Sequence, residues 1–553
     1  MANPIVTVNV TQTVAPTPST LQETGAFISQ GGTTLAAGNY ALLTQVADLT
    51  PLLAAGLALT GIVWAASFGG QATVTTTAPH GVPVNQQFTV TIAGVQPTGY
   101  NGTFLATSTG ASTFTYFLAV NPGAFSTAGT YTPPSTAELL SMATTYFAQG
   151  AQQPVYVLEL GTGTVAQGVT ALTNFINNSQ QFFYSYLVPR SWDGNANFLA
   201  FLAGFETTTS KTYFFVTTNV QNYPLYTTLM KDVLTMVQPP VYRPWVTDNV
   251  TTVTWTTGIA TATMAVAHGI NPGDTFTLTG ILSGTVPAGY NGTFIALPGT
   301  TGTALVYAVA VNPGTYTSGG TLLTSVYSSP GAPATEFTMA SMFFVTLNYN
   351  PSTTNKVPPL AFSFLFGVTP FPTLGNKALL ASLAAANINY VGTGAQGGIS
   401  STIVFNGHTM DGRPFNYWYS VDWMQINVQL NVGNAIINGS NTTINPLYYN
   451  QDGINRLQQV AINTGASAIT FGLALGKTIQ TSLDGPVFAL ALQSGTYAGQ
   501  LVVNAVPFVN YTVENPSHYK IGEYDGLAMV YTPLRGFEHV IFNINVTDFV
   551  SAG

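Results

Sequence analysis

The pattern of apolar and polar positions alternates between helical and strand-like spacing in the first half of the chain. Leu139, Met142, Ala143 and Tyr146 fall on one helical face, and an apolar run at residues 155–158 follows them. Two further helix–strand pairs are expected, at 164–178 with 182–188 and at 195–206 with 213–216. Alternation at this spacing predicts a largely parallel sheet covered by helices. It resumes after residue 330, where we expect a strand at 360–366, a helix at 375–386 and a strand at 387–391.

The first of these helices carries signals for its two ends. Ser135 and Glu138 fit a capping box, in which the Glu138 carboxylate bonds back to the backbone N–H of Ser135. Gly150 is expected to end the helix, because glycine readily adopts the left-handed conformation that follows a last helical turn.

A different pattern, of Thr-, Val- and Phe-rich runs broken by Asn-Gly and Pro-Gly turns, occurs twice. Both copies contain the string Gly-Tyr-Asn-Gly-Thr-Phe and, further on, Val-Asn-Pro-Gly. The signature residues are His80, Tyr100, Asn101 and Gly102 in the first copy and His268, Tyr290, Asn291 and Gly292 in the second. Such runs and turns predict small antiparallel β domains. We expect two homologous all-β insertions, placed at surface loops of the α/β host.

The two ends of the chain alternate strictly between apolar and polar residues. The apolar positions are Ile5, Val6, Val8 and Val10 near the N-terminus and Val540, Phe542, Ile544, Val546 and Phe549 near the C-terminus. Alternation with a period of two gives each strand one apolar face. An extended end needs a sheet edge, which its own domain or a neighbouring subunit can supply.

The chain is therefore predicted to be a mixed α/β, multidomain protein with extended β arms at both ends. We expect an N-terminal arm at 1–20, a core at 21–71 with 133–250, β insertions at 72–132 and 251–325, a second core part at 326–535 and a C-terminal arm at 536–553.

Composition favours a subunit of a large assembly. Only 5% of the 553 residues are charged, against roughly 25% in ordinary globular proteins. A surface with so few charges offers little repulsion against association. The net charge of −8 and the 11 scattered Lys and Arg residues argue against a nucleic-acid partner.

Other features limit where and how the protein works. There is no Cys, which excludes disulfides and thiolate chemistry. The N-terminal segment lacks the pattern of a signal peptide. The apolar run at 52–68 is interrupted by two glycines and a threonine and lacks flanking basic residues, so we expect a buried helix and strand and no stable membrane insertion.

Motifs for cofactors and metals fail on their context. Residues 392–397 match G-x-G-x-x-G, but a β-like run follows where a dinucleotide site needs a helix. Residues 472–478 resemble a P-loop that is one residue too short. None of the histidines pairs with another at metal-ligand spacing. Asp411, Arg413, Trp418 and Asp422 could line a sugar site, although surface ion pairs are the simpler reading. No cofactor is expected.

The order of segments resembles the sheath proteins of bacteriophage contractile tails. The resemblance lies in residues 138–149 with the strand after them, 375–394, 412–422 and the closing 522–549. It implies a structural subunit that polymerises as a helix around an inner tail tube protein. Arms at the two ends would add strands to sheets of adjacent subunits. It also implies contacts with baseplate and tail-terminator proteins, assembly in the host cytoplasm, a place in the virion tail and a contraction that drives the tube into the host.

Three other functions remain open at this point. A receptor- or carbohydrate-binding virion protein would use the paired β insertions, where Tyr100 and Tyr290 look exposed. A capsid or tube subunit fits the α/β body less well. An enzyme is the class that the sequence supports least.

Overall fold

The computed structural model describes residues 21–66, 70–82, 87–118, 120–150, 153–178, 183–205, 211–220, 222–227, 231–239, 247–265, 268, 270, 275–283, 289–301, 303–323, 336–372, 376–393 and 401–537. The chain divides into two compact units, each of which is described by itself. The larger unit spans residues 24–348 and 360–414, and the smaller unit combines 1–23, 349–359 and 415–553.

The body of the larger unit is built on a six-stranded sheet in the order β12-β11-β10-β1-β9-β2. Its strands are β1 (Gly25–Ser29), β2 (Tyr40–Leu43), β9 (Val155–Glu159), β10 (Ser185–Leu187), β11 (Tyr213–Thr218) and β12 (Val233–Val237). Its helices are α1 (Val46–Leu49), α2 (Pro134–Phe147), α3 (Val165–Asn178), α4 (Ala196–Phe205), α6 (Thr338–Leu347) and α7 (Lys377–Ala385). All neighbouring strands are parallel except β2, which runs antiparallel to β9. The predicted parallel, covered sheet is confirmed.

Helices cover both faces of this sheet. On one face, α3 and α4 contribute Leu172 and Phe198 to a core that includes Ala26 of β1 and Phe214 of β11. On the other face, Phe27 of β1 packs against rings of α2 and α6. Strands β1, β10, β11 and β12 are buried along their whole length, as a sheet between two helical layers requires.

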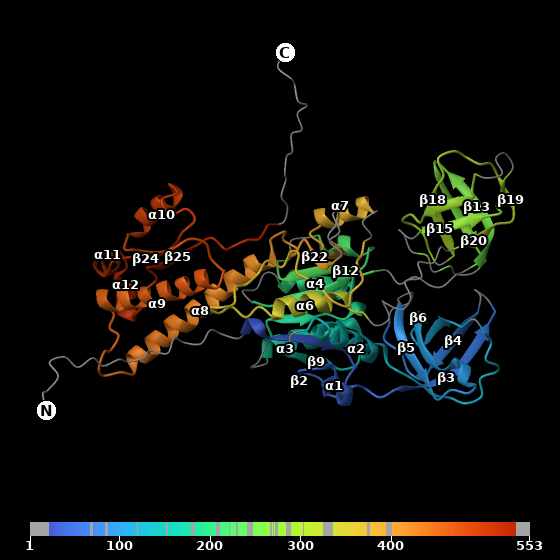
Figure 1. The fold of residues 1–553 in the computed structure, drawn as a ribbon, viewed down its shortest axis with the longest axis horizontal. Coiled ribbons are helices and arrows are strands. Elements are labelled where there is room, and N and C mark those ends of the chain that lie inside the picture. Colours follow the sequence, from blue (N-terminus) through green and yellow to red (C-terminus); the bar gives the residue numbers. More distant parts are fainter. Residues whose placement is uncertain are drawn as a thin grey trace, which may run out of the picture. The chain divides into compact units, whose positions relative to one another are not determined.

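The first β module is a closed barrel in the order β3-β4-β7-β6-β5-β8. Its strands are β3 (Leu57–Ala65), β4 (Gln71–Thr76), β5 (Gln87–Ala93), β6 (Gly102–Gly110), β7 (Thr113–Phe117) and β8 (Thr130–Tyr131). The barrel thus begins at Leu57, in a stretch that the sequence assigned to the core. Figure 1 shows the strands of this barrel in blue.

The second β module has a six-stranded sheet in the order β17-β15-β20-β13-β14-β18 and a separate pair, β16-β19. Its strands are β13 (Thr247–Thr256), β14 (Ile259–Met264), β15 (Thr275–Thr279), β16 (Leu282–Ser283), β17 (Gly292–Ile295), β18 (Ala304–Ala308), β19 (Tyr316–Ser318) and β20 (Thr321–Leu323).

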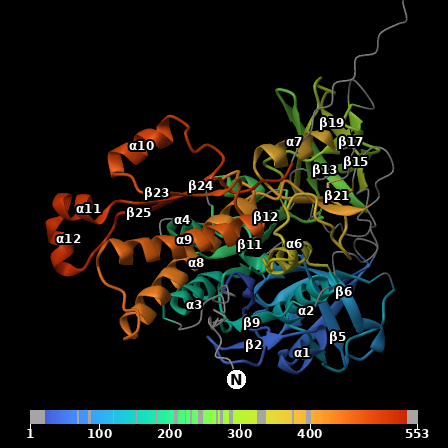
Figure 2. The same ribbon diagram turned by 60° about the vertical axis from the view of Figure 1, so that its left-hand side comes forward.

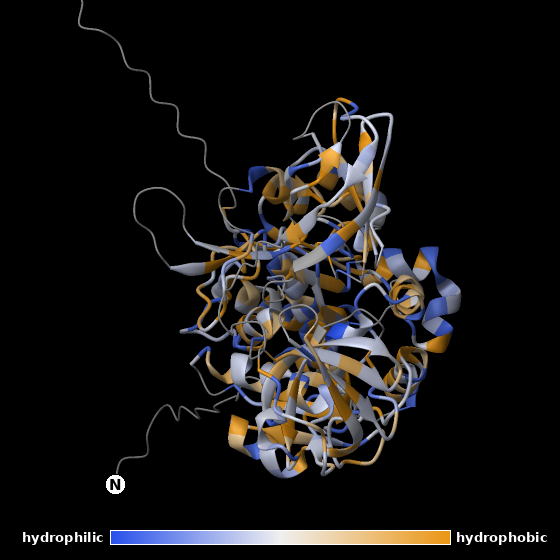
Figure 3. Cartoon of the chain, turned by 90° about the vertical axis from the view of Figure 1, so that its right-hand side faces the viewer, coloured by the Kyte–Doolittle hydropathy of each residue, from blue (hydrophilic) through white to orange (hydrophobic). Residues whose placement is uncertain are grey.

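Colouring the chain by hydropathy shows mostly white and orange ribbon with short, scattered blue stretches, as the low charge content leads one to expect (Figure 3).

The smaller unit packs helices around a three-stranded sheet in the order β23-β24-β25. Its elements are α8 (Phe415–Ser440), α9 (Gln451–Thr470), β23 (Thr478–Thr481), α10 (Gly485–Gln493), β24 (Leu501–Ala505), α11 (Phe508–Glu514), α12 (Pro516–Ile521) and β25 (Leu527–Val530). The sheet lies between α9 and α10 in two views (Figures 1 and 2).

Three local predictions are wrong. Helix α2 begins after Pro133, which has no side-chain cap, so Ser135 lies inside the helix, and the Glu138 carboxylate accepts a hydrogen bond from the backbone of Arg190 instead. Residues 53–56 form no helix, and the following apolar run is barrel strand β3. Residues 360–366 form only an isolated bridge, Phe364–Ile403, although they run beside β22 (Thr402–Phe405).

None of the helices in the described ranges combines the length and apolar character that crossing a membrane requires.

Candidate functional site

The residues predicted to act as inter-subunit arms lie outside the described residues. These are Ile5, Val6, Val8 and Val10 at one end and Val540, Phe542, Ile544, Val546 and Phe549 at the other. What the structure does describe is a three-stranded sheet in the smaller unit.

The three-stranded sheet of the smaller unit has two outer strands. β24 pairs in parallel with β23 and antiparallel with β25, and neither β23 nor β25 pairs with another named strand in the described part of the chain. The central strand β24 is fully buried, while β23 and β25 keep part of their surface exposed. Backbone N–H and C=O groups on such outer strands can accept an added strand.

Amide side chains fix this sheet to α9 and to the turn before α10. Gln458 of α9 is buried and donates to the backbone oxygens of Thr481 (2.7 Å) and Val503 (2.9 Å). Asn504 of β24 accepts from Leu483 N (2.8 Å) and donates to Leu483 O (2.8 Å). Neutral amides satisfy buried backbone groups without the desolvation penalty of a charge, so these bonds fix α9 and the turn before α10 to the sheet.

The signature residues of the two modules are structural, and they do the same work in both. Asn101 accepts from Val95 N and donates to Val95 O, both at 2.9 Å. Asn291 makes the matching pair with Ile281, at 2.8 and 2.9 Å. Gly102 and Gly292 have φ angles of 148° and 150°, and a Cβ there would lie 3.0 and 3.1 Å from a phenylalanine ring. Only glycine fits this backbone.

The histidines of the modules serve turns. His80 Nδ1 accepts from Val82 N at 3.2 Å and His268 Nδ1 accepts from Ile270 N at 3.0 Å. Both rings are buried. Because Nδ1 is an acceptor, the proton of the neutral His80 ring sits on Nε2, which faces Thr113 O at 3.2 Å. The shared turn role that the repeat suggests is the one found.

Tyr100 and Tyr290 are not exposed. They are 1% and 2% accessible, and their hydroxyls donate to Gly123 O (2.7 Å) and Gly314 O (2.8 Å). The interpretation of the modules as a tyrosine-lined receptor or carbohydrate site therefore loses the residues on which it rested.

One repeated residue, a tryptophan, was not predicted from the sequence. Trp64 Nε1 donates to Leu118 O at 2.8 Å, and Trp255 Nε1 donates to Val309 O at 2.7 Å. The signal was present: Trp255 lies inside the predicted second insertion, while Trp64 lies just before the predicted first one. Their alignment would have moved the start of the first module towards Leu57.

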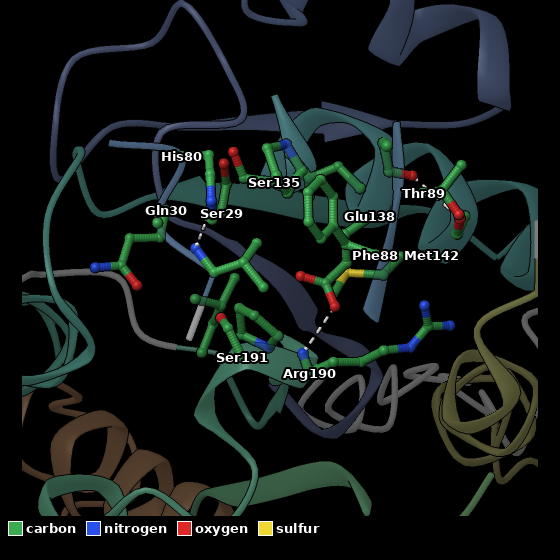
Figure 4. A pocket seen from close by; sticks show the side chains of 18 of the residues that line it. Ser29, Gln30, His80, Phe88, Thr89, Ser135, Glu138, Met142, Arg190 and Ser191 are labelled. Carbon is green, nitrogen blue, oxygen red and sulfur yellow. Dashed lines mark hydrogen bonds between the residues drawn. The ribbon is translucent and has the colours of Figure 1, made fainter. Parts of the chain in front are cut away.

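A small pocket of about 100 Å³ lies in the larger unit, at the point where the order of successive strands switches from one side of β1 to the other. It is lined by Ser29 and Gln30 after β1, by residues 189–191 after β10 and by the start of α2. Doubly wound sheets bind ligands at such switch points. Here His80 (Figure 4) and Val82, from the loop between β4 and β5, line the same pocket, and His80 Nδ1 accepts a hydrogen bond from Val82 N.

The charged groups beside this pocket hold the body together. Glu138 accepts from Arg190 N at 2.8 Å, and the Arg190 guanidinium donates to Glu336 O and lies 4.6 Å from the centre of the Phe337 ring. Burial raises the pKa of Glu138 and of Glu336, and Arg190 opposes both shifts. In the sequence, Glu138 comes shortly after the first module and Glu336 shortly after the second. Arg190 therefore bonds to both points at which the chain re-enters the body of the larger unit.

The failed motifs also find structural explanations. β21 (Tyr390–Thr393) pairs antiparallel with β22, so strand follows the glycine loop and no helix begins there among the described residues. Strand β23 follows the P-loop-like residues 472–478. The described residues hold no cluster of three His, Cys, Asp or Glu side chains fit for a metal ion. Asp411 accepts from Thr409 Oγ1 and Arg413 N within its own turn.

No family model and no curated protein matches the chain. Among solved structures it is similar to the helical sheath of the anti-feeding prophage in a contracted state, with 11% identity and a TM-score of 0.43 over 98% of this chain and 99% of that one. It is also similar to a sheath tail protein of Listeria innocua, with 9% identity and a TM-score of 0.32 over 82% and 85%. Both are sheath proteins, but because these TM-scores lie below 0.5, the function proposed below rests on the residues themselves.

Proposed function

We propose that the protein is the structural subunit of a contractile tail sheath. It polymerises around an inner tail tube through strand exchange of its terminal arms, and its contraction drives the tube through the host envelope. The observation that carries the proposal is the three-stranded sheet of the smaller unit, whose outer strands β23 and β25 pair only with β24 among the described strands. The alternating ends of the chain supply strands of matching character.

In this mechanism, subunits are linked by completing a sheet. A three-stranded sheet packed on a helix is stable alone, and each added strand satisfies a further row of backbone groups. An arm with one apolar face, such as the one carrying Phe542 and Ile544, buries that face against the helical layer as it pairs. Such links keep neighbouring subunits connected while the subunits themselves move.

The proposed mechanism also implies an energy source for contraction and a set of partner proteins. Contraction draws on free energy stored during assembly, so the mechanism uses no nucleotide. We expect the protein in the virion tail after assembly in the host cytoplasm, with the inner tube, baseplate and tail-terminator proteins as partners. The two β modules are homologous, arose by duplication of one domain and decorate the outside of the sheath.

Matched substitutions in the N-terminal arm test the proposal. Val6→Asp with Val8→Asp places two charges on the apolar face, and Thr7→Asp with Asn9→Asp places the same two charges on the polar face. Negative-stain microscopy of the purified chain is expected to show tubes for the wild type and the polar-face control and none for the apolar-face variant. Tubes that persist after removal of residues 1–15 and 538–553 would overturn the strand-exchange mechanism.

A further inference from the structure

The six-stranded sheet of the larger unit continues beyond β12. Val237 N donates to Asn389 O and Asn389 N donates to Thr235 O, both at 3.0 Å, which brings β21 alongside β12. β22 pairs antiparallel with β21. Residues 361–366 follow β22, with Leu365 N bonded to Thr402 O at 2.9 Å and Val404 N bonded to Ser363 O at 3.0 Å. The outermost segments of the extended sheet are therefore β2 at one end and residues 361–366 at the other.

The segment 361–366 presents a row of aromatic side chains, which we call the aromatic edge. Phe362, Phe364 and Phe366 are 43%, 61% and 56% exposed, while Leu365 between them is 3% exposed. The row continues inward across the sheet: the ring of Phe362 lies 5.8 Å from Phe405, which stacks 4.9 Å from Tyr390. The opposite face of the same strands is buried in the core.

A glycine of the discarded dinucleotide motif belongs to this row. A Cβ on Gly392 would lie 2.5 Å from the ring of Phe405. Glycine is required there so that the Phe405 ring can lie over the backbone of the neighbouring strand, which gives Gly392 a packing role.

Among the described residues, no hydrogen bond reaches the outward backbone groups of Phe364 in the aromatic edge. Ser363 and Leu365 bond inward to β22, so in an antiparallel ladder the N–H and C=O of Phe364 point outward. At Phe366 the outward groups are taken by the amide of Gln149, which accepts from Phe366 N at 2.9 Å and donates to Phe366 O at 2.7 Å. Gln149 does for one residue what a neighbouring strand would do for the whole segment.

The other end of the sheet has matching character. β2 pairs only with β9 among the described strands, and its Tyr40 and Leu42 are 37% and 48% exposed. Tyr40 contacts the rings of Phe175 and Phe183. These belong to the core cluster against which Tyr390 also packs. The exposed apolar residues of both ends therefore lie on the same face of the sheet.

Neither end carries the charges that usually protect an edge strand. Residues 33–47 and 357–371 contain no Asp, Glu, Lys or Arg. Exposed, uncharged apolar edges are sites of strand pairing between chains.

We propose that the two ends pair with each other in successive copies of this chain, so that the aromatic edge of one copy lies antiparallel to β2 of the next. The strand directions fit this contact. β2 runs against the five parallel strands. Residues 361–366 run with them, since Asn389 joins in parallel and two antiparallel steps follow. Two copies in the same orientation thus meet antiparallel, with their apolar rows on one face.

This contact is separate from the arms and goes beyond the function proposed above. It joins two different surfaces, so it is heterologous and repeats from copy to copy as a ring or a helix. It would couple the larger units of neighbouring subunits directly.

The absence of cysteine makes a covalent test clean. Two double variants of the full chain, Tyr40→Cys with Phe364→Cys and Leu42→Cys with Phe364→Cys, sample two registers that keep the same face. Directly opposed residues of a hydrogen-bonded antiparallel pair bring their Cα atoms to about 5.5 Å, which lies in the range that disulfides span. After mild oxidation, non-reducing electrophoresis is expected to show a ladder beyond dimer for at least one double variant. Each single variant should remain monomeric, because like positions do not meet.

A control pair and the arm variants separate the possible failures. Ile444→Cys with Phe364→Cys offers a thiol at a 95% exposed position of the smaller unit and should give no ladder. If neither register exceeds that control, or if single variants form dimers as readily, the pairing is overturned. A ladder that persists in Val6→Asp with Val8→Asp supports edge pairing even where tubes are lost. Tubes in wild type without any ladder would refute this inference alone.

Discussion

The two β modules share their turns and much of their core but differ in how they close. In the first, β6 runs from Gly102 to Gly110 and pairs with β7, which closes a barrel. In the second, β17 ends at Ile295 and no strand ladder joins it to β18 among the described residues, although Leu297 N donates to Val306 O at 2.7 Å. Pro298 and Gly299 stand where Ser108 and Thr109 continue the strand, and Gly299 has a φ of 100°. The repeated residues make the same turn contacts in both modules, and the differing residues Pro298 and Gly299 lie shortly after β17 ends.

A second difference lies in one hydroxyl. Tyr116 donates to Tyr100 O at 3.1 Å, whereas the hydroxyl of the corresponding Tyr307 is buried with no hydrogen-bond partner among the described residues. The same side chain is thus satisfied in the closed module and unsatisfied in the open one. A residue shared by both modules can therefore differ in its hydrogen bonding, because its surroundings differ.

The largest expected effect comes from exchanging the closure residues. Ser108→Pro with Thr109→Gly should open the first module and destabilise it by about 3 kcal/mol, because proline interrupts the strand. Pro298→Ser with Gly299→Thr should lengthen β17 and slow amide hydrogen exchange where β17 faces β18. Amide hydrogen exchange over residues 102–117 and 292–308 measures both. Unchanged protection in both variants would show that closure is set elsewhere.

The shared asparagines should have equal effects. Asn101→Ala and Asn291→Ala each leave one buried backbone N–H and one C=O without their partner, which costs about 2 kcal/mol. The free energies of unfolding in guanidinium, together with amide hydrogen exchange measured within each module, check the two predicted losses of stability. A difference above about 1 kcal/mol between the modules would show that these turns are not equivalent.

The tyrosine pair should give effects of different sign. Tyr116→Phe loses a satisfied hydrogen bond and should cost about 1 kcal/mol, while Tyr307→Phe removes an unsatisfied hydroxyl and should be neutral or stabilising. The free energies of unfolding of the two variants, measured side by side, decide. Equal destabilisation would mean that the Tyr307 hydroxyl has a partner in solution.

The smallest effect appears only in alkali. Burial raises the pKa of Tyr116 and of Tyr307, and nearby Tyr100 and Tyr290 add to it. Their contribution to stability is therefore complete below the unfolded value of about 10 and is lost as the pH rises above it. Unfolding midpoints between pH 9 and 12 should fall in the same range for both modules. The double variant Tyr116→Phe with Tyr307→Phe should flatten that fall.

Sequence patterns predicted the regular parts of this molecule. Buried parallel strands and amphipathic helices carry strong periodic signals, which is why β9, β11, α3 and α4 were found where expected. The failures lie where a distant residue overrides a local signal. Glu138 fits a capping box, but Arg190 takes its carboxylate. Residues 360–366 look like a strand, but the Phe362 backbone turns to a φ of 66° and pairing is reduced to one bridge.

The candidate assembly surfaces were only partly foreseeable. Alternation at the two ends of the chain predicted strands in search of an edge, but not which edge. The sheet of the smaller unit became visible only when residues from 478 to 530 were brought together. Likewise, nothing local marks Gly392 as the seat of a phenylalanine ring from the next strand.

A map of the assembled tube at a resolution that shows the backbone tests the central claim most directly. The account predicts residues from the ends of neighbouring copies hydrogen-bonded along β23 or β25, so that each sheet contains strands from more than one chain. Both ends folded onto their own copy, with no backbone bonds between chains, would contradict it.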